Sequence, residues 1–553
     1  MTAPEPIDPP TRGRPRLAEL LVAALLLLAM AAQIGLGADR LSVTTDEYAH
    51  LPAGYSYWVT GDFRLNRQHP PLAKLTGALP LVIARGELST ERAWPYFEQA
   101  PEHGSTFWQE WFFGETLIHG DNDLPHDGGI AWARRAMIPF GWIAAVAAWL
   151  LTRRLFGRRA GLAALSFAAF SPNLLAHAGL VNTDAAMAAF YVATPTALYA
   201  WLLRPHPALL VLSGVLLGLG LASKFSNALL LPVAAVMIAV AVWQGRLDLR
   251  RAGLAGAALA GLAVVTVWAA YLFQAPPWAW LEGLGLVYDD RADDPIHLLL
   301  GHYATGRAWF TYFLVALVLK TPLSTLAAAV LGGVAMRAAR HRLDLLARTV
   351  LILPPVLLYL AMSARAELMG VRYVLGVVPF LCVLGGAGVA WAWDHAGRWA
   401  GVAALLPVAT ALSALTTWPW HLSYHNALIP SDEAFLHALD DSNNDWYQGW
   451  KELVRLQEAG ELPALTVDVT EVSSRRLGYP GDWRVRAIGG RPLPGLHALS
   501  AFEYTRNRHL LAGQRERYPI LFDHPVVGVV AGCIVLVYVD PETRPPREEP
   551  DAG

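Results

Sequence analysis

The sequence predicts a mainly α-helical, polytopic membrane protein with a small C-terminal α/β domain outside the membrane. Of its 553 residues, 54% are hydrophobic and only 16% are charged, whereas soluble globular domains carry about a quarter charged residues. The formal net charge of -2 offers no basic surface, so we expect no nucleic-acid partner. Cys382 and Cys533 lie in a predicted span and in the C-terminal part, and they form neither a disulfide framework nor a metal site.

Long apolar segments define the transmembrane part of the chain, residues 17–420. Residues 1–16 form a mostly polar tail, and the apolar run from Leu17 has about twenty residues, the length of one membrane span. We therefore expect a retained first helix, with a cleaved signal peptide as the alternative. Further apolar segments bring the total to about eleven transmembrane helices. They lie at 132–152, 160–179, 185–203, 208–222, 226–243, 252–273, 308–336 (one span with a broken entry), 347–362, 373–392 and 399–417.

Clusters of arginine predict the orientation of these helices. If the N-terminus is cytoplasmic, every loop that carries such a cluster is also cytoplasmic by alternation, as the positive-inside rule requires. The long loop 39–131 and the C-terminal part then lie outside, in a multi-pass protein of the cell (inner or plasma) membrane. The clusters are Arg153, Arg154, Arg158 and Arg159; Arg246, Arg250 and Arg251; and Arg337, Arg340 and Arg342.

Two regions are predicted to fold outside the apolar spans. Loop 39–131 is rich in Trp and Tyr, which suit the headgroup region, so we expect short interfacial helices there. Residues 421–540 are predicted to form an extracytoplasmic α/β domain, and residues 541–553 a disordered tail. The domain is expected to contain a helix at Trp446–Glu458 and β-like runs at Ala464–Val472, Trp483–Ile488, Gly495–Glu503 and Val527–Val539.

Asp46 and Glu47 are the candidate catalytic residues. They follow the first span directly, and carboxylates beside a bilayer are costly unless they are paired, bound to metal or functional. One interpretation is an acid pair that caps the helix beginning near Tyr48. The other is general base catalysis, in which a carboxylate removes the proton of an acceptor hydroxyl that attacks the anomeric carbon of a sugar. An inverting displacement with a phosphate leaving group needs one such base and nearby cations.

Several other polar residues fall at the outer ends of the predicted spans. His69, Lys74, Lys224 and Arg372 are candidates to bind a carrier phosphate or the donor. The alternatives are a turn residue at His69 and cations that reach the headgroups from the ends of spans. Asp184 either caps the following helix or holds a divalent metal ion together with Asp46. A divalent metal is thus the one cofactor that these residues suggest.

The motifs around these residues resemble a known family. D-E at Asp46–Glu47 followed by H-P-P-L-A-K-L at His69–Leu75 is similar to the protein O-mannosyltransferases, and so to the wider C-type glycosyltransferase superfamily with its lipid A aminoarabinose transferases. The resemblance implies a multi-helix transferase that uses a polyprenyl-phosphate sugar, with Asp46 as base and Glu47 as its neighbour. Further similar segments are Ser171–Asp184, Leu221–Asn227, Leu319–Leu323, Val371–Tyr373 and Asp441–Trp446.

The chain departs from the family pattern at two points. Gln68-His69-Pro70 stands where mannosyltransferases usually have an acid before H-P-P, which weakens the case for a metal. The β-trefoil insert of the eukaryotic enzymes has no counterpart, so a protein acceptor is not implied. The partners expected are a polyprenyl-phosphate sugar donor, a lipid, glycan or protein acceptor, and membrane lipids.

We therefore predict an inverting membrane glycosyltransferase that acts on the extracytoplasmic side. A donor that lies in the membrane explains why an enzyme would have so many spans. One alternative is a transporter or flippase of a lipid-linked sugar, which predicts polar residues through the middle of the membrane and paired repeats. The other is a non-catalytic membrane scaffold whose outer domain binds a partner.

Overall fold

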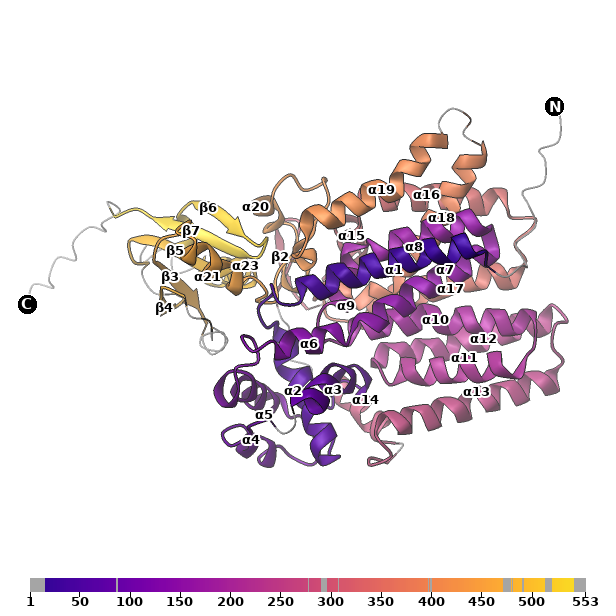
Figure 1. Cartoon of the computed structure of the whole chain (residues 1–553), viewed down its shortest axis with the longest axis horizontal. Coiled ribbons are helices and arrows are strands. Elements are labelled where there is room, and N and C mark those ends of the chain that lie inside the picture. The colour runs from indigo at the N-terminus through magenta and orange to yellow at the C-terminus, as the bar shows by residue number, and fades with distance from the viewer. Residues whose placement is uncertain are drawn as a thin grey trace, which may run out of the picture.

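A bundle of long helices carries a folded layer at one end. We call it the outer layer; it consists of the helices of loop 39–131 and the C-terminal part from residue 421. The computed structural model describes residues 15–85, 88–276, 278–289, 296–306, 308–395, 397, 400–470, 479, 481–489, 492–512 and 520–541. Figure 1 shows the C-terminal sheet and the helices of loop 39–131 at one end of the bundle, and the N-terminus at the other. Most of the predicted N-terminal tail (1–14) and of the predicted disordered tail (542–553) lies outside the described residues.

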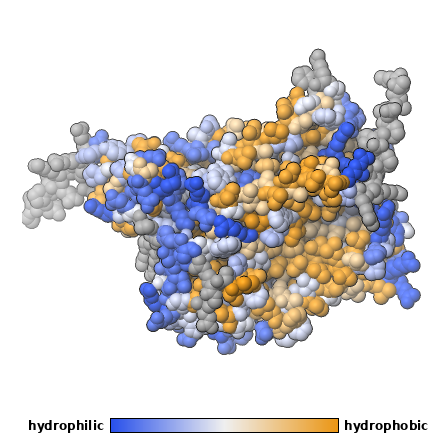
Figure 2. Space-filling view, in the orientation of Figure 1, coloured by the Kyte–Doolittle hydropathy of each residue, from blue (hydrophilic) through white to orange (hydrophobic). Residues whose placement is uncertain are grey.

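Eight helical segments among the described residues are long and apolar enough to cross a membrane. The bent pair α15 (Tyr312–Lys320) and α16 (Leu323–Ala338), with an angle of 113° at the break, is a ninth candidate and matches the broken entry predicted for 308–336. Figure 2 shows the result as an apolar surface in the middle of the molecule with hydrophilic surface at both ends. The eight are α1 (Leu17–Gly37), α6 with α7 (Gly129–Arg135, Ile138–Phe156), α10 (Asp184–Leu203), η2 with α12 (Phe225–Leu229, Leu230–Trp243), α13 (Leu249–Ala270), α17 (Leu345–Arg365), η3 with α18 (Val371–Val377, Val378–His395) and α19 (Ala400–Thr417).

The mainly helical membrane fold is thus confirmed, whereas the expected number of eleven spans is not. The predicted span 160–179 is two shorter helices, α8 (Arg158–Ala169) and α9 (Pro172–Ala178), and 208–222 is the short helix α11 (Pro207–Leu221). The break between α8 and α9 follows from Ser171, which is extended because it precedes a proline and which caps α9 through its side chain. Such a break turns α9 toward the outer layer.

Loop 39–131 folds into short helices packed closely on one another. At Gly54 of α2 an added Cβ would lie 2.1 Å from the carbonyl oxygen of Lys74 in α3, and at Gly114 of α5 one would lie 1.7 Å from that of Tyr48. Only glycine permits backbones to approach so closely. The helices are α2 (Thr45–Thr60), α3 (Leu72–Arg85), α4 (Trp94–Glu98), α5 (Phe107–Glu115) and the π-helical η1 (Thr116–Asp121).

The C-terminal part contains a five-stranded sheet in the order β4-β3-β5-β7-β6. β3 pairs in parallel with β4 and β5, and β7 pairs antiparallel with β5 and β6. The predicted run Val527–Val539 is therefore a hairpin, with Ala531 and Gly532 at positive φ in its turn. The strands are β3 (Leu465–Val469), β4 (Trp483–Ala487), β5 (Gly495–Ser500), β6 (Val526–Val530) and β7 (Ile534–Val539).

Smaller elements accompany this sheet. They are the helices α20 (Asp432–Phe435), α21 (Trp450–Glu458) and α23 (Ala501–Leu510) and the 3₁₀ turns η5 (His421–Ser423), η6 (Asp441–Asn443) and η8 (Leu521–Asp523). The segment between α13 and α15 contains α14 (Ala279–Asp289), which packs against loop 39–131 at Arg67, and the antiparallel hairpin β1 (Ile296–Leu299) and β2 (His302–Thr305).

Buried side chains join the C-terminal part to the helical bundle. Lys320, at the end of α15, is 1% exposed and donates hydrogen bonds to the carbonyl oxygens of Leu422 (2.6 Å) and Asn443. The Asn443 side chain accepts a hydrogen bond from the N–H of Val371 at 3.0 Å and donates one to the Tyr312 hydroxyl at 3.0 Å. Segment 440–446 is in this way fixed beside the start of η3.

Candidate functional site

Asp46 lies in the first turn of α2, at the junction between the bundle and the outer layer. Its carboxylate accepts a hydrogen bond from Arg372 of η3 at 2.9 Å, and its side chain is 18% exposed. His50 lies one turn further along α2, with its Nε2 3.7 Å from Asp46. Burial raises the pKa of Asp46 above 3.8, while the charge of Arg372 opposes that rise. The result is a partly accessible carboxylate with one guanidinium and one imidazole beside it.

Glu47 points to a different environment from that of Asp46. It is fully buried, and both of its oxygens bind the guanidinium of Arg134 in α6, at 2.6 and 2.8 Å. It also accepts hydrogen bonds from the N–H groups of Thr44 (2.9 Å) and Val181 (3.1 Å). Burial alone would raise the pKa of Glu47, but Arg134 and these N–H groups lower it overall, so the group stays ionised. Glu47 thus connects α2, α6 and the turn before α10.

Asp184 and Lys224 form a second buried ion pair next to Asp46. The Lys224 ammonium lies 2.5 Å from Asp184 Oδ1 and 4.8 Å from the centre of the Tyr373 ring. The other oxygen of Asp184 is 3.9 Å from Nδ1 of His177 in α9. The charges of both Asp184 and Lys224 affect the pKa of Asp46, so these groups share one electrostatic site.

His69 lies close to this cluster, and Lys74 supports the turn that carries it. The His69 ring packs edge-on against His50 with 5.2 Å between centroids. The Lys74 ammonium is fully buried and donates hydrogen bonds to the carbonyl oxygens of Asn66 (2.5 Å) and His69 (2.7 Å) and to the Tyr57 hydroxyl (3.0 Å). Its three donor positions are therefore used inside the protein, which favours a positioning role over contact with a phosphate.

The C-terminal part supplies one wall of the site. Trp446 lies with its ring 4.5 Å from the guanidinium carbon of Arg372, a cation–π distance. Its carbonyl oxygen accepts a hydrogen bond from the N–H of Thr45 at 3.1 Å, and its ring packs edge-on against His177. Asp46 and Arg372 are thus held between α2, η3 and a segment that lies almost 400 positions after Asp46 in the chain.

Within the described part of the chain, Asp46 and Asp184 do not belong to a larger ligand set for a metal ion. No group of three or more His, Cys, Asp or Glu side chains suited to metal binding occurs among the described residues. The two predicted ligands, Asp46 and Asp184, are each paired with a cation, Arg372 and Lys224. Because these cations already neutralise the carboxylates, the donor set favours binding of an anion over binding of a metal.

A groove of about 500 Å³ opens beside His69. It runs between the segment after α2 and the segment that joins α13 to α14. Aromatic rings line it together with the charged side chains of Asp62, Arg64, Arg67, Glu102 and Glu282. The aromatic residues are Tyr57, Phe63, Tyr271 and Trp278. Trp278 is 60% exposed and lies just beyond the end of α13, so the groove adjoins the apolar helices.

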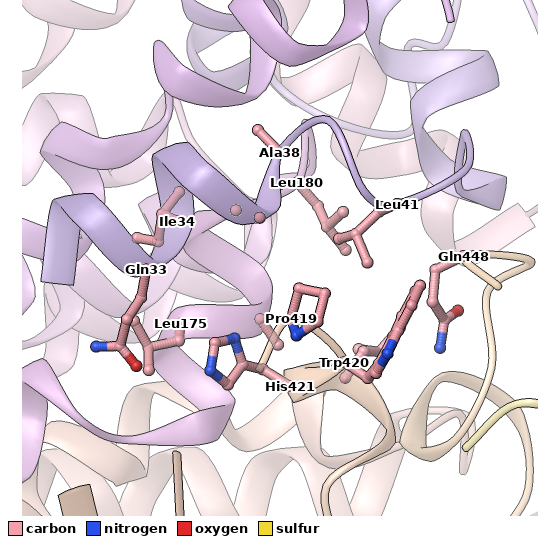
Figure 3. A pocket seen from close by; sticks show the side chains of 14 residues that line it. Gln33, Ile34, Ala38, Leu41, Leu175, Leu180, Pro419, Trp420, His421 and Gln448 are labelled. Atoms are coloured by element: carbon pink, nitrogen blue, oxygen red, sulfur yellow. The ribbon is translucent and has the colours of Figure 1, made fainter. Parts of the chain in front are cut away.

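A much smaller pocket, of about 20 Å³, lies between the end of α1, α9 and residues 419–422. Figure 3 shows Gln33, His421 and Gln448 along its length, with Ile34, Leu175 and Leu180 among the apolar side chains around them. The lining contains none of the residues predicted for the site.

Sequence reasoning missed four residues that the structure places in or directly behind the site. His50 carried a signal, because a spacing of four puts it on the same helical face as Asp46. Tyr373 and Trp446 stood inside motifs recognised only by resemblance. Arg134 carried no signal, since it is one of two adjacent arginines at the start of an apolar run.

Comparison with known proteins links part of the chain to a family. The model described as dolichyl-phosphate-mannose-protein mannosyltransferase matches residues 129–271, a segment that includes Asp184 and Lys224. Comparison with curated proteins gives no significant sequence match.

Solved structures resemble the whole chain. ArnT from Cupriavidus metallidurans in the apo state is 14% identical, with 94% of this chain and 97% of that chain covered and a TM-score of 0.45. The oligosaccharyltransferase AglB from Archaeoglobus fulgidus, in complex with an inhibitory peptide and a dolichol-phosphate, is 10% identical, with coverage of 90% and 71% and a TM-score of 0.48. The Archaeoglobus fulgidus oligosaccharyltransferase in the apo form is 11% identical, with coverage of 89% and 71% and a TM-score of 0.51. The predicted resemblance to lipid-phosphate-dependent glycosyltransferases is therefore confirmed, by the family model over residues 129–271 and by a fold shared with the archaeal oligosaccharyltransferase.

Proposed function

We propose that this protein is an inverting membrane glycosyltransferase that moves a sugar from a polyprenyl-phosphate donor to an acceptor on the extracytoplasmic side. The observation that carries the proposal is the placement of one partly accessible carboxylate, Asp46, beside the cations Arg372 and Lys224. A displacement at an anomeric carbon needs a base on one side and stabilisation of a leaving phosphate on the other. The family model that matches residues 129–271 supports a sugar linked to a lipid phosphate as the donor.

In the proposed reaction, Asp46 takes the proton of an acceptor hydroxyl. The hydroxyl oxygen forms a bond to the anomeric carbon while the bond from that carbon to the phosphate oxygen breaks, and the pair of electrons leaves with the polyprenyl phosphate. Arg372 and Lys224 balance the charge of the departing phosphate. Arg372 is paired with Asp46 and Lys224 with Asp184, so the phosphate competes with these two carboxylates for the cations. The raised pKa of Asp46 makes its carboxylate a stronger base than an exposed aspartate.

The other predicted site residues take supporting roles in this proposal. Glu47 positions Asp46 by fixing the first turn of α2 to Arg134. Lys74 holds the turn that presents His69 to the groove. His69 lies between the groove and His50, so we assign it to contact with the donor.

The groove beside His69 gives the donor a route from the membrane. Its aromatic rings suit a sugar and its Arg67 suits a phosphate, while the neighbouring end of α13 lies next to the lipid phase in the predicted topology. A donor that entered here would keep its polyprenyl chain in the bilayer and bring its phosphate toward Lys224 and Arg372. No soluble nucleotide-sugar site is needed for this arrangement.

The arginine clusters support the extracytoplasmic placement of the site. Arg153 of α7 pairs with Glu19 at the start of α1, and Asp46 follows the end of α1. Arg246 pairs with Asp344 at the start of α17, and Arg372 follows the end of α17. The arginines therefore lie at the end of the bundle away from Asp46, and the positive-inside rule puts that end in the cytoplasm.

Release of labelled sugar from polyprenyl-phosphate hexoses and pentoses tests the proposal. We expect the wild-type protein to turn over at least one donor and Asp46→Asn to be slower by about 10²–10⁴-fold, the usual contribution of a general base. Asp432→Asn, which changes an exposed carboxylate near α20, is the matched control and should retain full activity. Equal turnover by wild type and Asp46→Asn would remove Asp46 from the mechanism. Uptake of intact lipid-linked sugar into vesicles without turnover would favour the flippase.

A further inference from the structure

A separate pocket opens on the outer layer, between hairpin β1–β2 and helix α23. Its volume is about 280 Å³, close to the lower limit of about 300 Å³ for pockets that bind small molecules. We call it the outer pocket; its wall includes Leu298, Gly301, Tyr303, His437, Arg508 and His509. None of the residues assigned above to donor or base lines it.

Among the residues that the structure describes, the ionisable groups in the wall of the outer pocket carry only positive charge or none at neutral pH. These wall residues include no carboxylate, while Arg508 is permanently charged. The Arg508 guanidinium approaches the ring nitrogens of His437 at 3.1 and 3.2 Å. Within the part of the chain that the structure describes, Arg508 forms no ion pair and no other hydrogen bond, so donors of its guanidinium remain for a ligand. This composition selects for an anion.

An aromatic surface stands beside this cation. The rings of Tyr303 and His509 are stacked, with centroids 4.4 Å apart and an angle of 17° between their planes. The Tyr303 hydroxyl donates to the carbonyl oxygen of Thr505 at 2.8 Å, which fixes the ring, and His509 is exposed. A fixed aromatic face next to a guanidinium suits a sugar ring that carries an acidic group, because the ring's apolar face packs on the aromatic side chain while the acid meets the cation.

The outer pocket and the site at Asp46 share one structural segment. The N–H groups of Leu300 and Gly301 donate to the carbonyl oxygens of Ala438 (2.8 Å) and His437 (2.7 Å), so the hairpin is bound directly to the residues that precede η6. Asp441 of η6 pairs with Arg506 of α23 at 3.0 Å. Asn443 of the same turn accepts a hydrogen bond from the N–H of Val371, the neighbour of Arg372, so η6 contacts both sites.

We propose that the outer pocket binds the acceptor of the transfer reaction through a phosphate or carboxylate on a saccharide. The proposal rests on the proposed function, since only a transferase has an acceptor. It deepens that function by naming an acidic glycan as the acceptor class. Arg508 binds the acidic group, and the stacked pair of Tyr303 and His509 packs on the ring.

Direct binding to the full-length protein in nanodiscs of neutral lipid tests this assignment without any turnover. The probes are glucose 6-phosphate, glucuronate, glucose and inorganic phosphate. The binding of each probe is measured by saturation-transfer NMR. We expect glucose 6-phosphate or glucuronate to bind at least tenfold more tightly than glucose and than inorganic phosphate, and the better of the two identifies the acidic group. Arg508→Gln should weaken that binding at least tenfold. Arg484→Gln, which changes an exposed arginine of β4, should leave it unchanged.

Three results would overturn the assignment. They are equal affinity for glucose and its acidic derivatives, unchanged affinity in Arg508→Gln, and binding of inorganic phosphate or an acidic peptide as tight as that of the acidic sugars. Asp46→Asn separates this proposal from the transferase: it should retain the binding of the acidic sugar while it loses turnover. A wild-type protein that turns over donor yet fails to bind any acidic sugar would disprove the acceptor site alone.

Discussion

At the scale of single residues, the reactivity of Asp46 depends on the guanidinium of Arg372. Burial raises the pKa of Asp46 above 3.8, and Arg372 offsets part of that rise. A base must be deprotonated, so transfer should decline as the pH falls through this raised pKa. In Arg372→Gln the offset is lost, and we expect the acid limb of the pH profile of kcat/KM to move to higher pH, with the plateau reduced about tenfold or more.

Arg365→Gln, at the end of α17, is the control that should leave the acid limb at the wild-type pH. An acid limb at the same pH in Arg372→Gln and wild type would contradict this coupling.

The second prediction at this scale concerns Glu47, the acidic neighbour of the base. Glu47→Gln leaves the fully buried Arg134 without a countercharge, and breaking such a pair costs about 3–5 kcal/mol. We expect a clear fall in the thermal unfolding temperature of Glu47→Gln, with little change in Asp46→Asn. Because the pKa of Glu47 is lowered below 4.5 in the folded state, its stabilisation is present above pH 4.5 and is lost as the pH falls through the lowered value. A Glu47→Gln protein as stable as wild type but inactive would instead indicate a direct catalytic role.

The sequence drew attention to single charged residues at the outer ends of the predicted spans. Asp46, Lys224 and Arg372 are such residues, and the structure brings them close together, while their roles in a reaction stay predictions. The pairing of Lys224 with Asp184 could not be predicted, because these two residues are 40 positions apart in the sequence and meet only through helix packing. The direction of a side chain was equally inaccessible: Lys74 occurs in a conspicuous motif, yet its ammonium points into the protein.

At the scale of elements, the turn between α2 and α3 depends on Lys74. Burial lowers the pKa of this lysine, and the nearby Glu110 opposes that shift, so both groups belong to one buried network. Lys74→Met keeps most of the side-chain volume but leaves the carbonyl oxygens of Asn66 and His69 without their donor, at a cost of about 1–3 kcal/mol for each unsatisfied group. We expect faster hydrogen exchange in residues 61–71 and slower transfer because His69 is displaced. Lys451→Met, in α21, is the control and should leave hydrogen exchange in this turn unchanged. Unchanged exchange in Lys74→Met would contradict the prediction and would indicate that Lys74 is only a phosphate ligand.

Periodicity and composition located most elements but not the breaks within them. The apolar runs and the β-like runs all correspond to helices or strands. The break at Ser171–Pro172 and the turn at Ala531–Gly532 are local features inside runs that remain apolar, so a hydropathy pattern passes over them. The first break precedes α9, whose His177 lies 3.9 Å from Asp184.

At the scale of the whole molecule, the C-terminal part is a wall of the cluster around Asp46, and Asn443 is one of the residues that attach it to the bundle. The Asn443 side chain bonds to the Val371 N–H and to the Tyr312 hydroxyl, and Trp446 follows it against Arg372. Asn443→Ala removes these bonds and leaves the buried Val371 N–H without a partner. We expect transfer to fall at least tenfold, together with faster hydrogen exchange in residues 440–446 and 369–373.

Asn507→Ala provides the matched control for this prediction, because the one hydrogen bond of the Asn507 side chain to a described residue goes to the Glu503 carbonyl oxygen within α23. It should retain both activity and exchange rates. The decisive comparison is between the two regions in Asn443→Ala. If residues 440–446 exchange faster while 369–373 and the activity stay at wild-type levels, the C-terminal part only covers the site. Joint loss of protection and activity would mean that Arg372 is held in place for catalysis by a wall that the last quarter of the chain provides.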